Sequence, residues 1–153
     1  MLCLLSAMVL AGCSTGPVAI REPELDADEV RVCRELVAAL PQTLDGAERR
    51  EVEPEGAPGA ACGDPAVVLT CGGEVPDDFT RTAFCQEVDG VGWYVADAAL
   101  ADESVDVTLV TVGYRPIVSV VVPAELRPEG VATASSVLSA PVEAHTELVR
   151  PCR

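Results

Sequence analysis

The chain begins with an apolar run that ends at residues 10–13 (LAGC). Small residues directly before a cysteine are typical of a bacterial lipoprotein signal, whose cysteine carries the lipid and becomes the first residue of the mature protein. We therefore predict that residues 1–12 are a signal peptide and that Cys13 is the lipidation site. Only the chain after Cys13 then has to fold, and it does so in an oxidising space outside the cytoplasm.

Two other interpretations of this run stay open, an ordinary secretory signal and a short buried helix. Residues 1–12 contain no Lys or Arg, and so they lack the basic segment with which most signals begin. A membrane-spanning helix is disfavoured by length, since twelve helical residues rise about 18 Å against a hydrocarbon core of about 30 Å. We expect a protein anchored by lipid on the extracytoplasmic face of the membrane.

The net charge of −15 restricts the possible partners. Such a chain repels the phosphates of nucleic acids and the anionic headgroups of a bilayer. We therefore expect no nucleic-acid partner, and membrane attachment only through acyl chains on Cys13.

Five of the seven cysteines follow Cys13, an odd number for a compartment in which thiols pair. We predict one disulfide between Cys71 and Cys85, which bracket a loop, and a second between Cys33 and Cys152. Cys62 is then left as a free thiol. The spacings lack the paired C-x-x-C clusters of a zinc ribbon, so we expect no structural metal.

Residues 13–25 contain two prolines and no periodicity, which predicts a lipidated tether in front of a single domain over residues 26–153. A first helix is expected to begin at Asp26, whose carboxylate can form a capping box with Glu29. It should end before Pro41. A closing helix is expected after Pro128, kinked or restarted at Pro141.

Apolar and β-branched runs predict strands at residues 66–70, 91–95, 105–112 and 117–122, with 49–52 as a possible edge strand. We expect residues 105–112 and 117–122 to form a hairpin, which we place at the centre of the sheet. The sum predicts an α+β fold: a mostly antiparallel sheet of about four or five strands, with the N-terminal and C-terminal helices packed on one face.

Candidate catalytic groups are sparse. His145 is the only histidine and falls on the apolar stripe of the last helix, where a structural role is the common one. Cys62 could act as a nucleophile, but a lone thiol in an oxidising space tends to be capped. Six acidic residues lack the spacing of a calcium loop, so we interpret them as charged side chains in contact with solvent: Asp77, Asp78, Asp97, Asp102, Glu103 and Asp106. We predict no catalytic residue, metal or cofactor.

Aromatic residues and arginine are the types that anchor interfaces, which suggests an interaction surface of Trp93, Tyr94, Tyr114 and Arg115. Core packing is the simpler explanation for Trp93. The sequence thus favours a non-enzymatic module that binds an envelope protein or a cell-wall partner. A small-ligand capture domain, with an apolar pocket and a few polar groups, is the alternative. A third possible function is that of an enzyme that works through paired carboxylates.

The chain resembles the actinobacterial lipoprotein family of the domain of unknown function 3515. The resemblance rests on five motifs: residues 33–34 (CR) with 40–41 (LP), 63–65 (GDP), 69–72 (LTCG), 91–93 (VGW) and the 113–123 hairpin. It implies an extracytoplasmic lipoprotein and supplies no activity. The family commonly carries tryptophan where this chain has Cys62, so the resemblance assigns that thiol no role.

Overall fold

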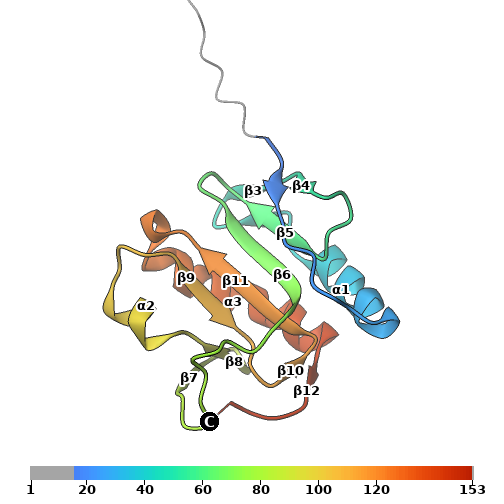
Figure 1. Cartoon of the computed structure of the whole chain (residues 1–153). Helices are drawn as coiled ribbons and strands as arrows, with labels where there is room; N and C mark the ends of the chain where they lie inside the picture. The colour runs from blue at the N-terminus through green and yellow to red at the C-terminus, as the bar shows by residue number, and fades with distance from the viewer. Residues whose placement is uncertain (1–15, 153) are drawn as a thin grey trace, which may run out of the picture.

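The computed structural model describes residues 16–152 (Figure 1). The predicted signal peptide and the predicted lipidation site Cys13 lie outside these residues. Among the helices of the described part, none is both long and apolar enough to span a bilayer.

An eight-stranded antiparallel sheet forms the centre of the fold, so the α+β class is confirmed and the predicted count of four or five strands is too low. Neighbouring strands along the sheet are β2 (Thr43–Leu44), β3 (Ala47–Arg50), β5 (Gly59–Cys62), β6 (Val67–Gly73), β11 (Ile117–Val122), β9 (Val107–Val110), β8 (Val91–Tyr94) and β7 (Cys85–Val88). Two short pairs lie beside it: β1 (Val18–Ala19) is parallel to β4 (Val52–Glu53), and β10 (Tyr114–Arg115) is antiparallel to β12 (Glu147–Leu148).

The N-terminal helix α1 (Ala27–Ala39) begins with the predicted capping box. The Asp26 carboxylate accepts hydrogen bonds of 2.9 Å from the amides of Asp28 and Glu29, and the Glu29 carboxylate accepts one of 3.1 Å from the Asp26 amide. These contacts satisfy amides that have no partner inside the helix. Cys33 and Leu36 then face the core.

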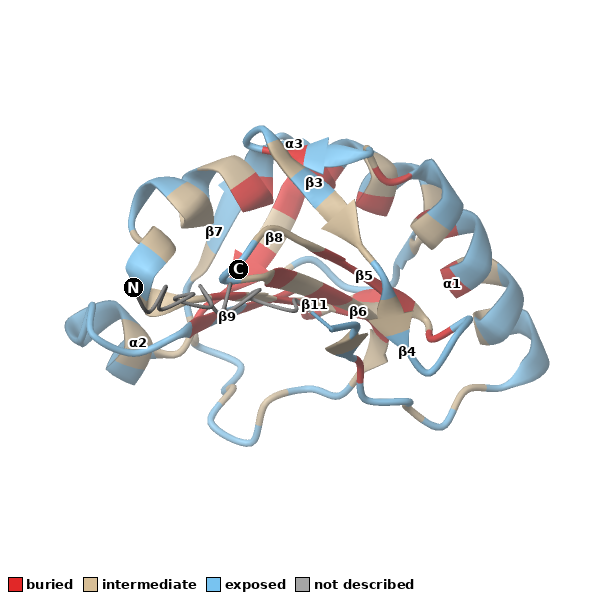
Figure 2. Ribbon diagram, turned by 90° about the horizontal axis from the view of Figure 1, so that it is seen from above, coloured by how far each residue is buried: buried red, intermediate tan, exposed pale blue. Residues whose placement is uncertain are grey.

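The C-terminal helix α3 (Glu129–His145) runs through Pro141 without a break, so the predicted restart does not occur. A single proline in the last turns removes one hydrogen bond, and the packing of the buried face outweighs that loss. Ala134, Leu138 and Val142 form this face. Figure 2 shows α1 and α3 together on one side of the sheet.

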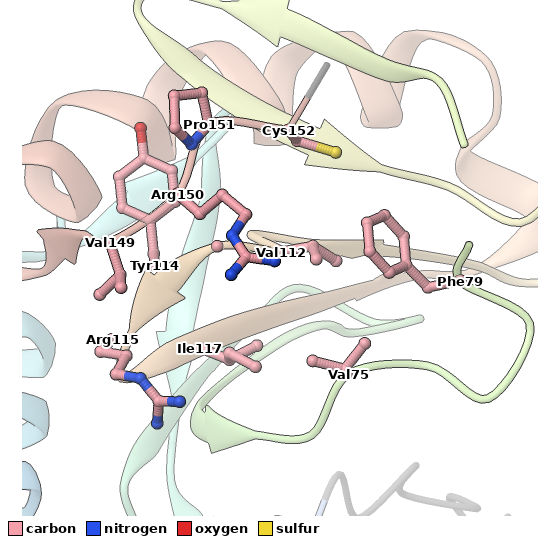
Figure 3. Close-up of a pocket in the computed structure, with 11 residues that line it drawn as sticks. Val75, Phe79, Val112, Tyr114, Arg115, Ile117, Val149, Arg150, Pro151 and Cys152 are labelled. Atoms are coloured by element: carbon pink, nitrogen blue, oxygen red, sulfur yellow. The ribbon is translucent and has the colours of Figure 1, made fainter. Parts of the chain in front are cut away.

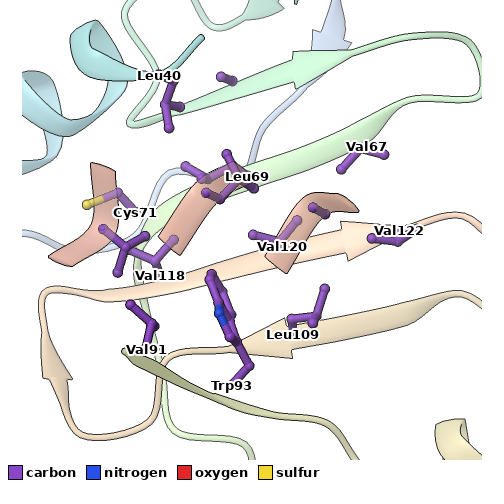
Figure 4. Packing of buried hydrophobic residues seen from close by; sticks show 14 of the residues in the cluster. Leu40, Val67, Leu69, Cys71, Val91, Trp93, Leu109, Val118, Val120 and Val122 are labelled. Carbon is purple, nitrogen blue, oxygen red and sulfur yellow. The ribbon is translucent and has the colours of Figure 1, made fainter. Parts of the chain in front are cut away.

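The main core fills the space between these two helices and the sheet (Figure 4). It is built by alternate residues of the central strands, which point toward the helices because side chains alternate along a strand. They include Leu69 and Cys71 of β6, Val118 and Val120 of β11, and Trp93 of β8.

Short elements close the ends of the core. These elements are the helix α2 (Asp97–Ala101) and the 3-10 turn Ala124–Leu126. The Arg127 guanidinium donates hydrogen bonds of 2.9–3.0 Å to the carbonyls of Ala99, Asp102 and Val105. It thereby holds α2 against the end of the sheet.

The disulfides join Cys33 to Cys71 and Cys85 to Cys152, so the predicted pairing is wrong. The same four cysteines take part, and Cys62 is free. The reason lies in the sheet: Cys71 points toward α1, where it meets Cys33, whereas Cys85 lies opposite Tyr94 on the other face. Two cysteines that flank a loop but sit on opposite faces of a sheet cannot reach each other.

The predicted tether is partly folded. The amides of Val18 and Ile20 donate hydrogen bonds of 2.9 and 2.8 Å to the carbonyls of Glu51 and Glu53. The Ile20 side chain is buried against Gly59 of β5. The folded domain therefore includes residues 18–25 and does not begin at residue 26.

Candidate functional site

Most of the residues predicted to form an interaction surface lie inside the protein. Trp93, Tyr94 and Tyr114 are at most 5% exposed. Only Arg115 is exposed. The indole Nε1 of Trp93 donates a hydrogen bond of 3.1 Å to the Ser139 hydroxyl on α3. The predicted surface is wrong, because these rings stabilise the fold by being buried.

The two tyrosines are packing residues. Tyr94 packs edge-on against Phe79, with ring centroids 5.1 Å apart. The Tyr114 hydroxyl donates a hydrogen bond of 3.3 Å to the Gly90 carbonyl. Burial raises the pKa of both phenols. Both therefore stay neutral at physiological pH.

The sheet face opposite α1 and α3, called the open face below, is covered at two ends. At one end lie residues 18–25, with Pro23 and Leu25 over Gly72. At the other end lies the loop of residues 74–84, which sets Phe79 on Tyr94. The middle of the open face is left hollow.

A groove of about 880 Å³ lies between the two covers. Its floor carries hydroxyl groups of Thr70, Ser119 and Thr108 from three neighbouring strands, so we call it the hydroxyl groove. Thr70 and Ser119 are directly opposite each other in the β6–β11 register. The rim is charged and mostly acidic: Arg21, Glu22, Glu24, Glu29, Glu74, Asp77 and Arg115.

A second hollow of about 290 Å³, the apolar pocket, adjoins this groove (Figure 3). The two share the residues Val75, Arg115 and Ile117. The other lining side chains of the apolar pocket are mostly aliphatic or aromatic, with Phe79, Val112 and Val149 among them. Together the two hollows form one continuous candidate site with an apolar end and a polar end.

The C-terminal segment forms one wall of the apolar pocket and is fastened at three points. β12 pairs with β10, the Gly113 carbonyl accepts hydrogen bonds of 2.9 and 3.1 Å from the amides of Val149 and Arg150, and Cys152 is bonded to Cys85. Gly113 has φ +102°, and a side chain there would overlap the Arg150 carbonyl. Only glycine fits this position.

The charge of the apolar pocket is opposite to that of the protein. Two arginines, Arg115 and Arg150, line it, and none of its lining residues is acidic. Glu147 lies opposite Arg115 in the β10–β12 register, but no ion pair joins them. Within residues 16–152 no side chain forms a hydrogen bond or ion pair with either guanidinium. Both are available to an anion.

The sequence profile of a family described as "Protein of unknown function (DUF3515)" matches residues 1–147. The chain belongs to this family. No curated protein and no solved structure matches it. The predicted membership of the domain of unknown function 3515 is thereby confirmed. The family description names no activity.

Sequence reasoning had missed most of this site in the DUF3515 chain. Arg115 was the one predicted surface residue that lines both hollows. No sequence pattern indicated that Val75, Val149 and Arg150 line a pocket, because the pocket forms only when the C-terminal segment packs beside the turn at Gly113. The row of three hydroxyl groups was missed as well, because Thr70 lies far in sequence from Thr108 and Ser119 and no local signal places β6 beside their hairpin.

Cys62 of this DUF3515 chain is half-buried at the end of β5, beside a hollow of about 200 Å³ at the start of α3. Burial raises the pKa of its thiol, and the nearby Arg49 charge opposes that shift only in part. A raised pKa leaves less of the nucleophilic thiolate. Cys62 is therefore a poor candidate for covalent chemistry.

The other residue types that could support catalysis or bind a metal do not gather into a site in the described part of the chain. His145 lies half-buried at the C-terminal end of α3. Over the described part of this DUF3515 chain, no three His, Cys, Asp or Glu side chains gather in a way that could hold a metal ion.

Proposed function

We propose that this DUF3515 protein is a lipid-anchored, extracytoplasmic, non-enzymatic domain that captures a small ligand on the open face of its sheet. The observation that carries this proposal is the apolar pocket beside the hydroxyl groove. A concave apolar hollow with a few polar groups is the usual form of a small-molecule site. Capture of a protein through Trp93 and the two tyrosines has lost its basis, because those side chains are buried.

Two features support the lipid anchor and the extracytoplasmic location. The LAGC segment at residues 10–13 has the sequence of a lipoprotein signal. The disulfides Cys33–Cys71 and Cys85–Cys152 suit an oxidising compartment, since such bonds persist there and are rare in the cytosol.

Replacing Cys13 with alanine should release the protein from the membrane fraction and remove the mass of the acyl groups. The reason is that the acidic domain has no other means of attachment in this proposal. Cys62→Ala is the matched control, since it also removes a thiol outside the disulfides and should leave attachment intact. Membrane fractionation and intact-mass measurement check both. An unlipidated Cys13→Ala protein that still sediments with membranes would contradict the anchor.

Filling the apolar pocket should abolish ligand capture without unfolding the domain. Val112 is 6% exposed and lines the pocket, so the larger ring of Val112→Phe extends into the hollow. We expect the variant to lose binding of the neutral probe decanol, measured by calorimetry, and to keep a cooperative thermal transition. Val137→Phe, on the exposed side of α3, is the control that should bind as the parent does. Equal binding by a folded Val112→Phe protein would exclude the pocket.

A further inference from the structure

We infer that the apolar pocket binds a single-chain amphiphile with an anionic head, such as a fatty acid, with the chain against Val112 and Ile117 and the head at Arg115 and Arg150. This inference rests on the proposed function, and it adds the chemical class of the ligand. It also assigns to the two arginines the role of recognising the head.

The distribution of charge around the apolar pocket supports an anionic head on the ligand. The chain has 25 Asp and Glu against ten Arg, so a surface hollow chosen at random would be bordered by acids. The apolar pocket instead has two arginines and no acid. Figure 3 shows the Arg150 guanidinium among the lining side chains and the Arg115 guanidinium at the margin near Ile117. A guanidinium binds a carboxylate or phosphate through charge-assisted hydrogen bonds.

The size and lining of the apolar pocket support a single acyl chain on the ligand. Val75 and Val149 are 48% and 57% exposed, so the pocket leaves aliphatic surface in water that a ligand chain would cover. The volume of about 290 Å³ is at the lower end for small-molecule sites. That size suits one acyl chain of medium length and is small for a lipid with two chains.

The adjoining groove sets the direction of the ligand. Its mostly acidic rim repels an anion that lies deep within it, whereas Arg115 stands where groove and pocket meet. The anionic head is therefore expected at this junction. Any neutral polar group beyond the head would lie over the hydroxyls of Thr70 and Ser119.

Calorimetry on the disulfide-bonded chain of residues 14–153 tests the ligand class at low ionic strength, with each probe below its micelle concentration. Affinity for hexanoate, octanoate and decanoate should rise about fourfold per methylene while the chain stays in the pocket. Arg115→Gln with Arg150→Gln should lower decanoate affinity roughly tenfold, because each exposed ion pair contributes a factor of up to roughly five. Decanol affinity should not change.

Arg34→Gln, an exposed arginine on α1, is the control for lost charge and should leave decanoate binding as it was. Decylamine binding as tightly as decanoate, or decanoate binding unchanged in the double variant, would overturn the anionic class while leaving ligand capture in place. Failure of all probes, decanol included, would overturn the proposed function as well. Binding to phosphatidylglycerol vesicles but not to free decanoate would also overturn this inference, because the arginines would then recognise a membrane surface.

Discussion

Replacing both Cys33 and Cys71 with alanine is expected to lower the free energy of unfolding by about 4 kcal/mol, as an upper value from the loop-entropy model. The disulfide closes a loop of 38 residues in sequence between α1 and the central strand β6. Without it the unfolded chain gains freedom, and the helix loses its covalent link to the sheet. Substituting both cysteines avoids leaving one buried, unpaired thiol.

Urea unfolding followed by circular dichroism measures this loss. Cys62→Ala is the matched control, since it removes a thiol that forms no disulfide and is only half-buried. If the double variant lost no more stability than Cys62→Ala, the Cys33–Cys71 bond would be contradicted. Reducing the parent protein should lower its free energy of unfolding by at least as much, because reduction breaks this disulfide together with Cys85–Cys152.

Replacing Trp93 with alanine is expected to cost about 3–5 kcal/mol of unfolding free energy, as for other large aromatic residues in cores. The ring is 1% exposed and lies between the sheet and α3. Its removal leaves a cavity that the neighbouring strands cannot fill. The hydrogen bond from its Nε1 to the Ser139 hydroxyl is lost as well.

Trp93→Phe separates these two effects. It keeps much of the apolar volume and loses the hydrogen bond, so a smaller cost is expected, with about 1 kcal/mol of it from the bond. Urea unfolding of both variants gives the two values. A loss in Trp93→Ala near that of a surface substitution would mean that the ring is not part of the core.

Local signals in the sequence were sufficient for the elements that bury an alternating or helical face. The capping box at Asp26 places the start of α1, and β-branched runs identify β6 and β11 as strands. The centre of the sheet was predicted at the hairpin of residues 105–112 and 117–122, whereas the middle of the eight strands lies between β6 and β11. β3, β5 and β7 were missed or seen only in part. Their residues are charged or small, and they become strands because a neighbour supplies hydrogen bonds and a covering face.

The disulfide pairing and the site depend on which face of the sheet a residue occupies. Helical spacing alone puts Cys33 on the buried face of α1, three residues before Leu36, but its disulfide partner depends on the position of β6 beneath α1. In the same way, Arg150 reaches the pocket only because Gly113 holds the C-terminal segment. Periodicity within one element carries no information about such contacts between distant segments.

Ligand capture on the open face of the sheet is tested most directly by the amide chemical shifts of the nitrogen-15-labelled chain, recorded while decanoate is added. The largest saturable shifts are predicted around the apolar pocket, at Val75, at Val112 to Arg115, and at Val149, Arg150 and Cys152. Shifts that centre on α1 or α3, or that do not saturate at all, would contradict a binding site on the open face.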